Sequence, residues 1–147
     1  MCNQQNILRR HQSGSVILES LIAILIFSMG ILAVVGLQAA SISASSDAKY
    51  RTVASLLANQ LVGQMWVSNR TTLQSQFQTN GAQYNVWLPD VQAALPGVTA
   101  NPPTVAVTLV NGPTTTSSRV AITVFWKAPN DPAANAPHQY STVVQII

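Results

Sequence analysis

Residues 14–37 read GSVILESLIAILIFSMGILAVVGL, and this stretch decides the fold. From Val16 to Leu37 it has 22 residues, of which only Glu19 is charged. A helix rises about 1.5 Å per residue, so this span covers about 33 Å and matches a bilayer core of about 30 Å. The sequence therefore predicts a membrane-spanning helix. Because an unpaired carboxylate within such a helix costs about 2.5–3.5 kcal/mol or more, Glu19 is expected to have a partner.

The residues ahead of the span are basic. Arg9 and Arg10 precede Gly14, and no acidic residue occurs before Glu19. Positive charge keeps that end of a span in the cytoplasm. A basic leader that ends in Gly, followed by an uncharged residue, three apolar residues and a Glu five places after the glycine, resembles the class III signal of type IV prepilins.

This resemblance implies a set of events at the start of the chain. A prepilin peptidase is expected to cleave between Gly14 and Ser15 at the cytoplasmic face, and the new amino terminus at Ser15 is expected to be N-methylated. The apolar helix would be retained. The family usually has Phe where this chain has Ser15.

Glu19 is the predicted subunit-assembly residue. Its carboxylate is expected to pair with the free amine of Ser15 on a neighbouring subunit, because the pair cancels two charges that are each costly in lipid. The alternative is an interfacial Glu whose side chain reaches the headgroups. Gly30 and Gly36 are interpreted in two ways. In the first, each glycine weakens the helix by about 1 kcal/mol relative to Ala and so loosens it when the subunit leaves the bilayer. In the second, each glycine allows a neighbouring helix to pack closely in the membrane.

Few charges lie outside the leader. The chain of 147 residues has seven Lys and Arg, two of them ahead of Gly14, and four Asp and Glu, so the processed chain is nearly neutral. The remaining cations do not cluster, and no nucleic-acid partner is expected. Cys2 is the only cysteine and lies in the leader, so no internal disulfide is expected. Without a catalytic motif or metal-ligand spacing, the sequence predicts no enzyme activity, cofactor or metal.

The chain is expected to have three parts. Residues 1–14 are the cleaved leader, residues 15–47 the hydrophobic transmembrane and assembly half of the N-terminal helix, and residues 48–147 a periplasmic or extracellular head. No proline occurs before Pro89, so a single helix is predicted from Ser15 to about Asn69. Its second half carries apolar residues at three- and four-residue steps, which predicts one buried face. These residues are Tyr50, Val53, Ala54, Leu57, Ala58, Leu61, Val62, Met65 and Trp66.

The last third of the chain predicts a sheet. Thr104–Val110 and Arg119–Trp126 alternate apolar and polar residues, as half-buried strands do, and Tyr140–Ile147 supplies a third strand. A short helix is predicted from Asp90 to Leu95, started by Pro89 and closed by Pro96 and Gly97. The fold class is therefore α+β. This order resembles the ladle fold of type IV pilins, in which a long N-terminal helix packs on a small antiparallel sheet.

Four further segments narrow the resemblance to one group of type IV pilins. They are Gly30-Ile31-Leu32, Gly36-Leu37-Gln38, Leu95-Pro96-Gly97 following Trp87, and Val124-Phe125-Trp126. Together they resemble PilV-type minor pilins. The resemblance implies a subunit of the inner membrane with a cytoplasmic N-terminus, later part of a surface type IV pilus. It also implies other minor and major pilins as partners and a role in priming pilus assembly.

Other residues that could bind a metal or a ligand or be modified are interpreted without such a function. His138 lies in a Pro-rich loop and is interpreted as a solvated histidine rather than a metal ligand. Trp66, Trp87 and Trp126 are expected to be core residues rather than a binding surface. Asn69-Arg70-Thr71 matches a glycosylation acceptor, a match that often arises by chance.

Three other functions stay open. A pseudopilin of type II secretion shares the signal and the fold. A signal-anchored periplasmic enzyme or binding module would keep its N-terminus uncleaved. A secreted protein would lose the apolar segment, although 22 residues exceed the 7 to 15 that are typical of a signal-peptide core.

Overall fold

The computed structural model describes residues 13–112, 116–129 and 131–147. Most of the predicted leader, residues 1–12 with Arg9 and Arg10 among them, lies outside the described residues. The chain divides into two compact units, Met1–Ser43 and Ala44–Ile147.

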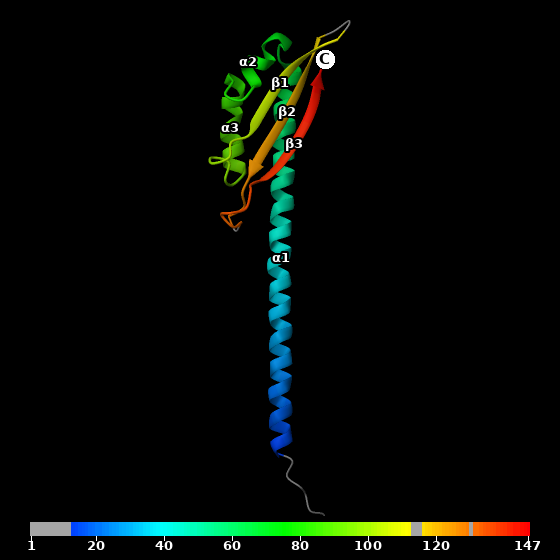
Figure 1. The fold of residues 1–147 in the computed structure, drawn as a ribbon, viewed down its shortest axis with the longest axis vertical. Coiled ribbons are helices and arrows are strands. Elements are labelled where there is room, and N and C mark those ends of the chain that lie inside the picture. The colour runs from blue at the N-terminus through cyan, green and yellow to red at the C-terminus, as the bar shows by residue number, and fades with distance from the viewer. Residues whose placement is uncertain (1–12, 113–115, 130) are drawn as a thin grey trace, which may run out of the picture. The chain divides into compact units, whose positions relative to one another are not determined.

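Helix α1, Ser13–Val67, is 55 residues long and starts in the first unit and ends in the second (Figure 1). The sequence predicts nearly this helix, because a few glycines without a proline are too weak to stop it. The helix ends where Ser68 turns back on it. The Ser68 N–H donates to the Met65 carbonyl at 3.2 Å, and its hydroxyl donates to the Gln64 carbonyl at 2.7 Å.

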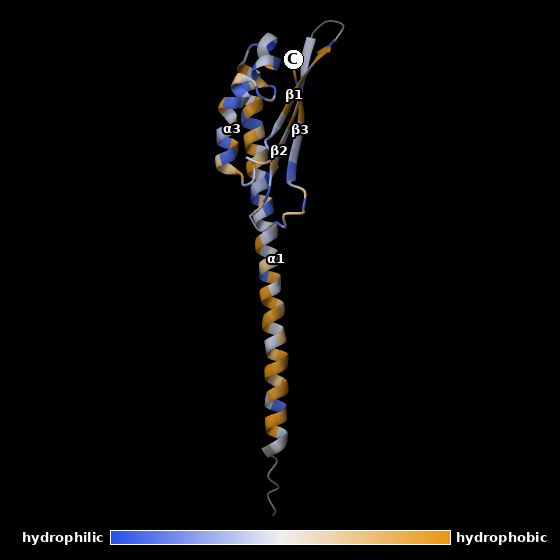
Figure 2. Ribbon diagram, turned by 60° about the vertical axis from the view of Figure 1, so that its left-hand side comes forward, coloured by the Kyte–Doolittle hydropathy of each residue, from blue (hydrophilic) through white to orange (hydrophobic). Residues whose placement is uncertain are grey.

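In the first unit, α1 is apolar and the side chains of residues 14–43 are exposed. Figure 2 shows the hydrophobic residues that follow one another along this part of the helix. Within Val16–Leu37, Ser20 and Ser28 interrupt the hydrophobic residues. Ser20 donates its hydroxyl proton to the Val16 carbonyl at 2.8 Å, and Ser28 donates to the Ile24 carbonyl at 2.7 Å. Both hydroxyl donors are therefore satisfied within the helix, as an apolar surrounding requires.

The second unit contains the rest of the described secondary structure. After the end of α1 come a 3₁₀ turn η1 (Arg70–Thr72), helix α2 (Leu73–Phe77), helix α3 (Ala82–Ala94) and strands β1 (Thr104–Asn111), β2 (Thr116–Trp126) and β3 (His138–Ile146). The described strands form an antiparallel sheet in the order β1-β2-β3. The predicted strands are confirmed, with β2 and β3 starting earlier than the alternation indicates. The predicted α+β fold, a long N-terminal helix packed on a small antiparallel sheet, is likewise confirmed.

The core of this unit lies between the second half of α1, helix α3 and one face of the sheet. Helix α1 contributes Ala54, Leu57, Ala58, Leu61, Val62 and Met65; the connecting region contributes Leu73, Phe77, Tyr84, Trp87, Val91, Leu95 and Val98; and the strands contribute Val105, Val107, Val120, Ile122, Val124, Trp126 and Ile146. Every second residue of β2 from Val120 to Trp126 is buried, which is the period of a strand with one covered face. The apolar stripe predicted on α1 thus packs within the second unit.

Trp66 is an exception to that stripe. Its side chain is 53% exposed, whereas Met65 is fully buried. Successive helix residues point about 100° apart, so the residue beside the last buried position turns toward solvent once the covering elements end. The core prediction is therefore wrong for Trp66. It is correct for Trp87 and Trp126, which are 1% and 2% exposed.

The prediction for the connecting region needs a correction. Helix α3 runs from Ala82 to Ala94, not from Asp90, and Pro89 lies inside it. Tyr84, Trp87 and Val91 are its buried residues and lie three or four places apart, so their packing outweighs the backbone hydrogen bond that proline removes. Pro89 and Asn85, the residue four places before it, are both exposed, so water can take the place of the N–H that proline lacks.

Candidate functional site

The first predicted site lies in the opening turns of α1. Gly14, Ser15 and Glu19 are exposed there, and Gly14 and Ser15 are already helical. Residues four apart lie on the same face of a helix, so Ser15 and Glu19 share one face. Within the described residues, the Glu19 carboxylate has neither a hydrogen bond nor an ion pair. A charge in this apolar surrounding is therefore available to a group from outside the chain.

The surface around Glu19 is apolar and uncovered. Residues Ile17, Leu18, Leu21 and Ile22 are between 48% and 63% exposed. By length and composition, the helix Gly14–Val67 can cross a membrane, and none of its most apolar window is buried. The apolar N-terminal helix is thus a candidate membrane anchor.

Gly30 and Gly36 lie in unbroken helix. A Cβ added at either glycine would meet no atom within 4 Å, so no described contact within the chain requires a glycine there. Gly30 lies in a shallow apolar depression that is lined by Ile26, Phe27, Ile31, Val34, Val35 and Gln38. Helix loosening at Gly30 and Gly36 stays a prediction, and so does close packing by a neighbouring helix.

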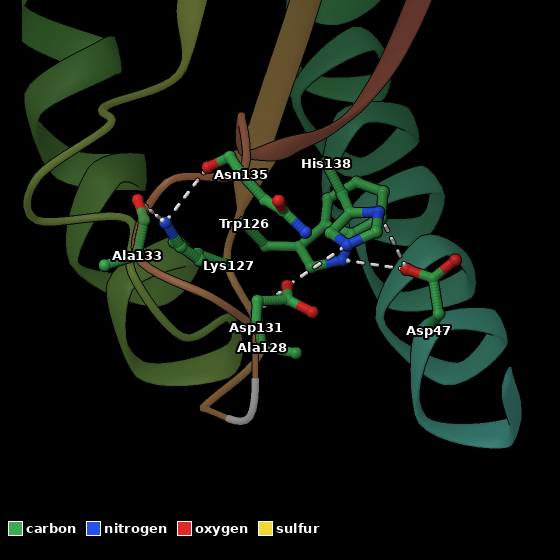
Figure 3. Close-up of polar contacts among 8 residues, drawn as sticks. All are labelled: Asp47, Trp126, Lys127, Ala128, Asp131, Ala133, Asn135 and His138. Carbon is green, nitrogen blue, oxygen red and sulfur yellow. Dashed lines mark hydrogen bonds and ion pairs between the residues drawn. The ribbon is translucent and has the colours of Figure 1, made fainter. Parts of the chain in front are cut away.

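The second site is a polar cluster in the second unit, which the sequence did not predict. Figure 3 shows the His138 ring between two carboxylates that come from different parts of the unit. Its Nδ1 lies 3.4 Å from Oδ1 of Asp47 on α1, and its Nε2 lies 3.1 Å from Oδ2 of Asp131 in the segment between β2 and β3. The ring also stacks on the indole of Trp126, with centroids 5.8 Å apart and planes at 14°.

Each carboxylate in this cluster also accepts a hydrogen bond from a neutral donor. The indole Nε1 of Trp126 donates to Oδ1 of Asp47 at 3.3 Å, and the N–H of Ala128 donates to Oδ2 of Asp131 at 2.9 Å. The cluster therefore ties α1 to the end of β2 and to the start of β3. We call Asp47, Trp126, Asp131 and His138 the clasp.

Lys127 makes three further hydrogen bonds to the neighbouring backbone. The Lys127 ammonium donates to the carbonyls of Ala133 and Asn135 at 2.8 and 3.0 Å, and the Lys127 N–H donates to the Pro96 carbonyl at 2.9 Å (Figure 3). Next to that carbonyl, Gly97 has a φ of +76°, and a Cβ there would lie 2.9 Å from the Lys127 Cβ. The Leu95-Pro96-Gly97 motif thus docks on the residue that follows the Val124-Phe125-Trp126 motif.

The interpretation of His138 as a solvated loop residue is wrong. His138 is the first residue of β3, and its side chain is 41% exposed between its partners. Sequence spacing did not indicate Asp47 as a partner, because Asp47 is remote in the chain and only strand pairing brings β3 to it, whereas Asp131 lies seven residues before His138. Among the described residues, no group of three or more His, Cys, Asp and Glu side chains is arranged to hold a metal ion.

Asn69 is exposed, as a glycosylation acceptor must be. Its side-chain carbonyl accepts from the Thr71 N–H at 3.0 Å and from the Thr71 hydroxyl at 2.9 Å, which caps the turn η1. This local role explains Asn69 without a modification.

Comparisons of the chain with models of known protein families, with curated proteins and with solved structures found no match.

Proposed function

We propose that the chain is a minor pilin of a type IV pilus, a non-enzymatic subunit that is processed by a prepilin peptidase and takes part in pilus assembly and priming. The observation that carries the proposal is the single helix α1. Its first part is apolar and exposed, with Glu19 as its one charge near the start, and its last part is amphipathic and packs in a small α+β unit.

This arrangement supports a subunit that uses one helix in two surroundings. The apolar part suits lipid before assembly and other apolar helices afterwards, because both cover its exposed side chains. The second unit has its own core, so it does not need the apolar part to bury its hydrophobic residues. An inner-membrane location with a cytoplasmic N-terminus, followed by a place in a surface pilus, belongs to the same proposal.

The Glu19 carboxylate is the proposed assembly residue. Its exposure and its lack of a partner among the described residues leave it available to the Ser15 amine that cleavage would create on a neighbouring subunit. The same pairing would be available with other minor and major pilins, because it needs only an amine and a carboxylate in an apolar surrounding.

Processing tests the proposal directly. The wild-type chain, co-expressed with a prepilin peptidase, is expected to lose residues 1–14, and Gly14→Ala is expected to block this loss. Gly30→Ala is the matched control, because a Cβ meets nothing within 4 Å at either position and both residues are helical. The measurement is the intact mass of the membrane-extracted protein.

The outcomes separate a processed pilin or pseudopilin from an anchored domain and from a secreted protein. Cleavage of the wild type and Gly30→Ala but not of Gly14→Ala supports a pilin or the related pseudopilin. An uncleaved wild type would contradict the proposal in favour of a signal-anchored domain, and cleavage near residue 40 would favour a secreted protein. Crosslinking in cells then separates the first two, because the captured partners belong either to a pilus or to a secretion system.

A further inference from the structure

We propose that a pocket at one end of the second unit binds a small organic carboxylate with an apolar chain. The pocket has a volume of about 460 Å³ and is lined by Arg70, Thr71, Leu109, Thr116, Ser118 and Ile146. This volume lies within the range of about 300–1,000 Å³ that is typical of small-molecule sites. The proposal concerns the second unit alone and does not depend on the function proposed above.

The pocket lies at the end of the second unit that is marked C in Figure 1, where β3 ends beside the paired ends of β1 and β2. Strand pairing places Leu109, Ser118 and Ile146 in one row across the three strands, with Ser118 in the middle. The turn η1, which follows the end of α1, contributes Arg70 and Thr71 to the same pocket. The pocket therefore lies between this turn and the last row of the sheet.

The row of side chains on the sheet belongs to the core face but is only partly covered. On β1, Val105 and Val107 are 2% and 5% exposed, whereas Leu109, the next residue on the same face, is 53% exposed. Ile146 at the other end of the row is buried. An apolar chain that enters the pocket would cover the exposed part of Leu109, and the burial of this surface favours binding.

The hydroxyl of Ser118 is the first polar group that a ligand would meet. Ser118 is 3% exposed, yet within the described residues its hydroxyl has no hydrogen bond. Its neighbour Ser117 differs, because the Ser117 hydroxyl donates to the Val110 carbonyl at 3.5 Å and accepts from the Gln145 amide at 2.8 Å. In the described part of the chain, no side-chain nitrogen or oxygen that is sealed from solvent lacks a partner, so the Ser118 hydroxyl opens into the pocket.

Arg70 supplies the charge of the pocket. Among the described residues, its guanidinium neither forms an ion pair nor donates a hydrogen bond. The three acidic residues of the second unit are Asp47, Asp90 and Asp131, and none of them lines the pocket. A guanidinium presents its N–H groups in a planar fork that fits the two oxygens of a carboxylate. The pocket therefore offers a carboxylate a cation that has no competing partner in its lining.

The three features together select one class of ligand. Arg70 favours an anion, the Ser118 hydroxyl can donate a hydrogen bond to it, and the row from Leu109 to Ile146 favours an apolar chain. An inorganic anion would leave the exposed leucine uncovered, and a neutral apolar molecule would leave the guanidinium unpaired. A carboxylate that carries a short apolar chain satisfies all three.

The experiment titrates hexanoate into the full chain in zwitterionic detergent micelles and follows the backbone amide signals by nuclear magnetic resonance. The amides of Thr71 and Ser118 are expected to shift in a saturable way, with a Kd in roughly the millimolar range. Hexanamide has the same chain without the charge, and it should bind about tenfold more weakly because it cannot form the charge-assisted bonds.

Two variants test the two polar groups separately. Arg70→Gln should weaken hexanoate binding by about tenfold, and Ser118→Ala, which keeps nearly the same volume, should weaken it by about fivefold. Arg119→Gln is the matched control, since Arg119 is exposed and follows Ser118 on the opposite face of β2. This variant should bind hexanoate as the wild type does.

The wild type alone can overturn the proposal. It is wrong if hexanoate causes no saturable shift at Thr71 and Ser118, or if hexanamide binds as tightly as hexanoate. Among the variants, unchanged binding by Arg70→Gln would overturn it, and so would an equal loss in Arg70→Gln and Arg119→Gln, which would indicate attraction by net charge alone.

Discussion

The indole Nε1 of Trp87 donates a hydrogen bond to the backbone carbonyl of Leu57 at 3.1 Å, and this bond joins α3 to the last third of α1. Trp87 is 1% exposed and lies 6.1 Å from the Tyr84 ring, centroid to centroid. A buried indole needs such a partner, because an N–H without one costs about 1–3 kcal/mol. The bond therefore fixes the position of α3 along the axis of α1.

Trp87→Phe tests this contact. Phenylalanine keeps an aromatic ring but removes the N–H and part of the volume, so the free energy of unfolding is expected to fall by about 2–3 kcal/mol. Trp66→Phe is the matched control, and a change below about 0.5 kcal/mol is expected because the Trp66 side chain is mostly exposed. Denaturant unfolding followed by circular dichroism measures both. Equal losses for the two variants would contradict the structural assignment.

Gly97→Ala and Gly63→Ala are expected to change stability in opposite directions. Gly97 has a φ of +76° and would place its Cβ 2.9 Å from the Lys127 Cβ, so alanine should destabilise the chain by about 1–3 kcal/mol. Gly63 is helical and exposed with nothing within 4 Å of an added Cβ, so alanine should stabilise by about 0.5–1 kcal/mol. Thermal unfolding of the two variants beside the wild type decides this. A neutral Gly97→Ala would show that the turn adjusts freely.

Tyr84 predicts a loss of stability at high pH. Burial raises the pKa of the Tyr84 hydroxyl above its ordinary value of about 10, and this hydroxyl donates to the Pro103 carbonyl at 2.7 Å. The folded state holds the proton more tightly than the unfolded state. The contribution of this group to stability is therefore complete below about pH 10 and is lost as pH rises through the folded-state pKa.

The measurement is the free energy of unfolding of the wild type and of Tyr84→Phe at a series of pH values. Near neutral pH, the variant is expected to be less stable by about 1 kcal/mol, because it lacks the hydrogen bond to Pro103. Above about pH 10 its stability should fall less steeply than that of the wild type. Parallel curves for the two proteins would rule out Tyr84 as the source of the slope.

Glu19→Gln and Glu19→Val test the proposed assembly residue. Both variants remove the one charge of the apolar span, so membrane insertion should be unchanged or improved. Processing is expected to continue, whereas incorporation into surface fibres should drop about tenfold or more, because the Ser15 amine of the neighbour loses its counter-charge in an apolar surrounding. The measurement is the amount of subunit in sheared fibres relative to the membrane pool. Asp90→Asn, which removes an exposed charge on α3, should incorporate normally. Normal incorporation of both Glu19 variants would reject the role of Glu19.

The regular elements that follow from one local pattern were predictable from the sequence. Val16 to Leu37 is apolar apart from Glu19, Ser20 and Ser28, and no proline interrupts α1, so its length and its exposed apolar part follow from composition. The alternation along β2 likewise predicts which side chains face the core. At the candidate site, Glu19 was predictable because an unpaired carboxylate within an apolar span is costly whatever tertiary structure the chain adopts.

Tertiary packing decided what local pattern could not. Proline at position 89 predicts a helix start, yet α3 continues through it because Tyr84, Trp87 and Val91 are buried together. The clasp is a similar case, since Asp47 and His138 meet only when β3 pairs with β2 beside α1. The sequence by itself determined the apolar helix, the strands and the lone charge at Glu19, because each depends on neighbouring residues. The position of α3, the exposure of Trp66 and the surroundings of His138 depend on distant residues, so only the tertiary structure decided them.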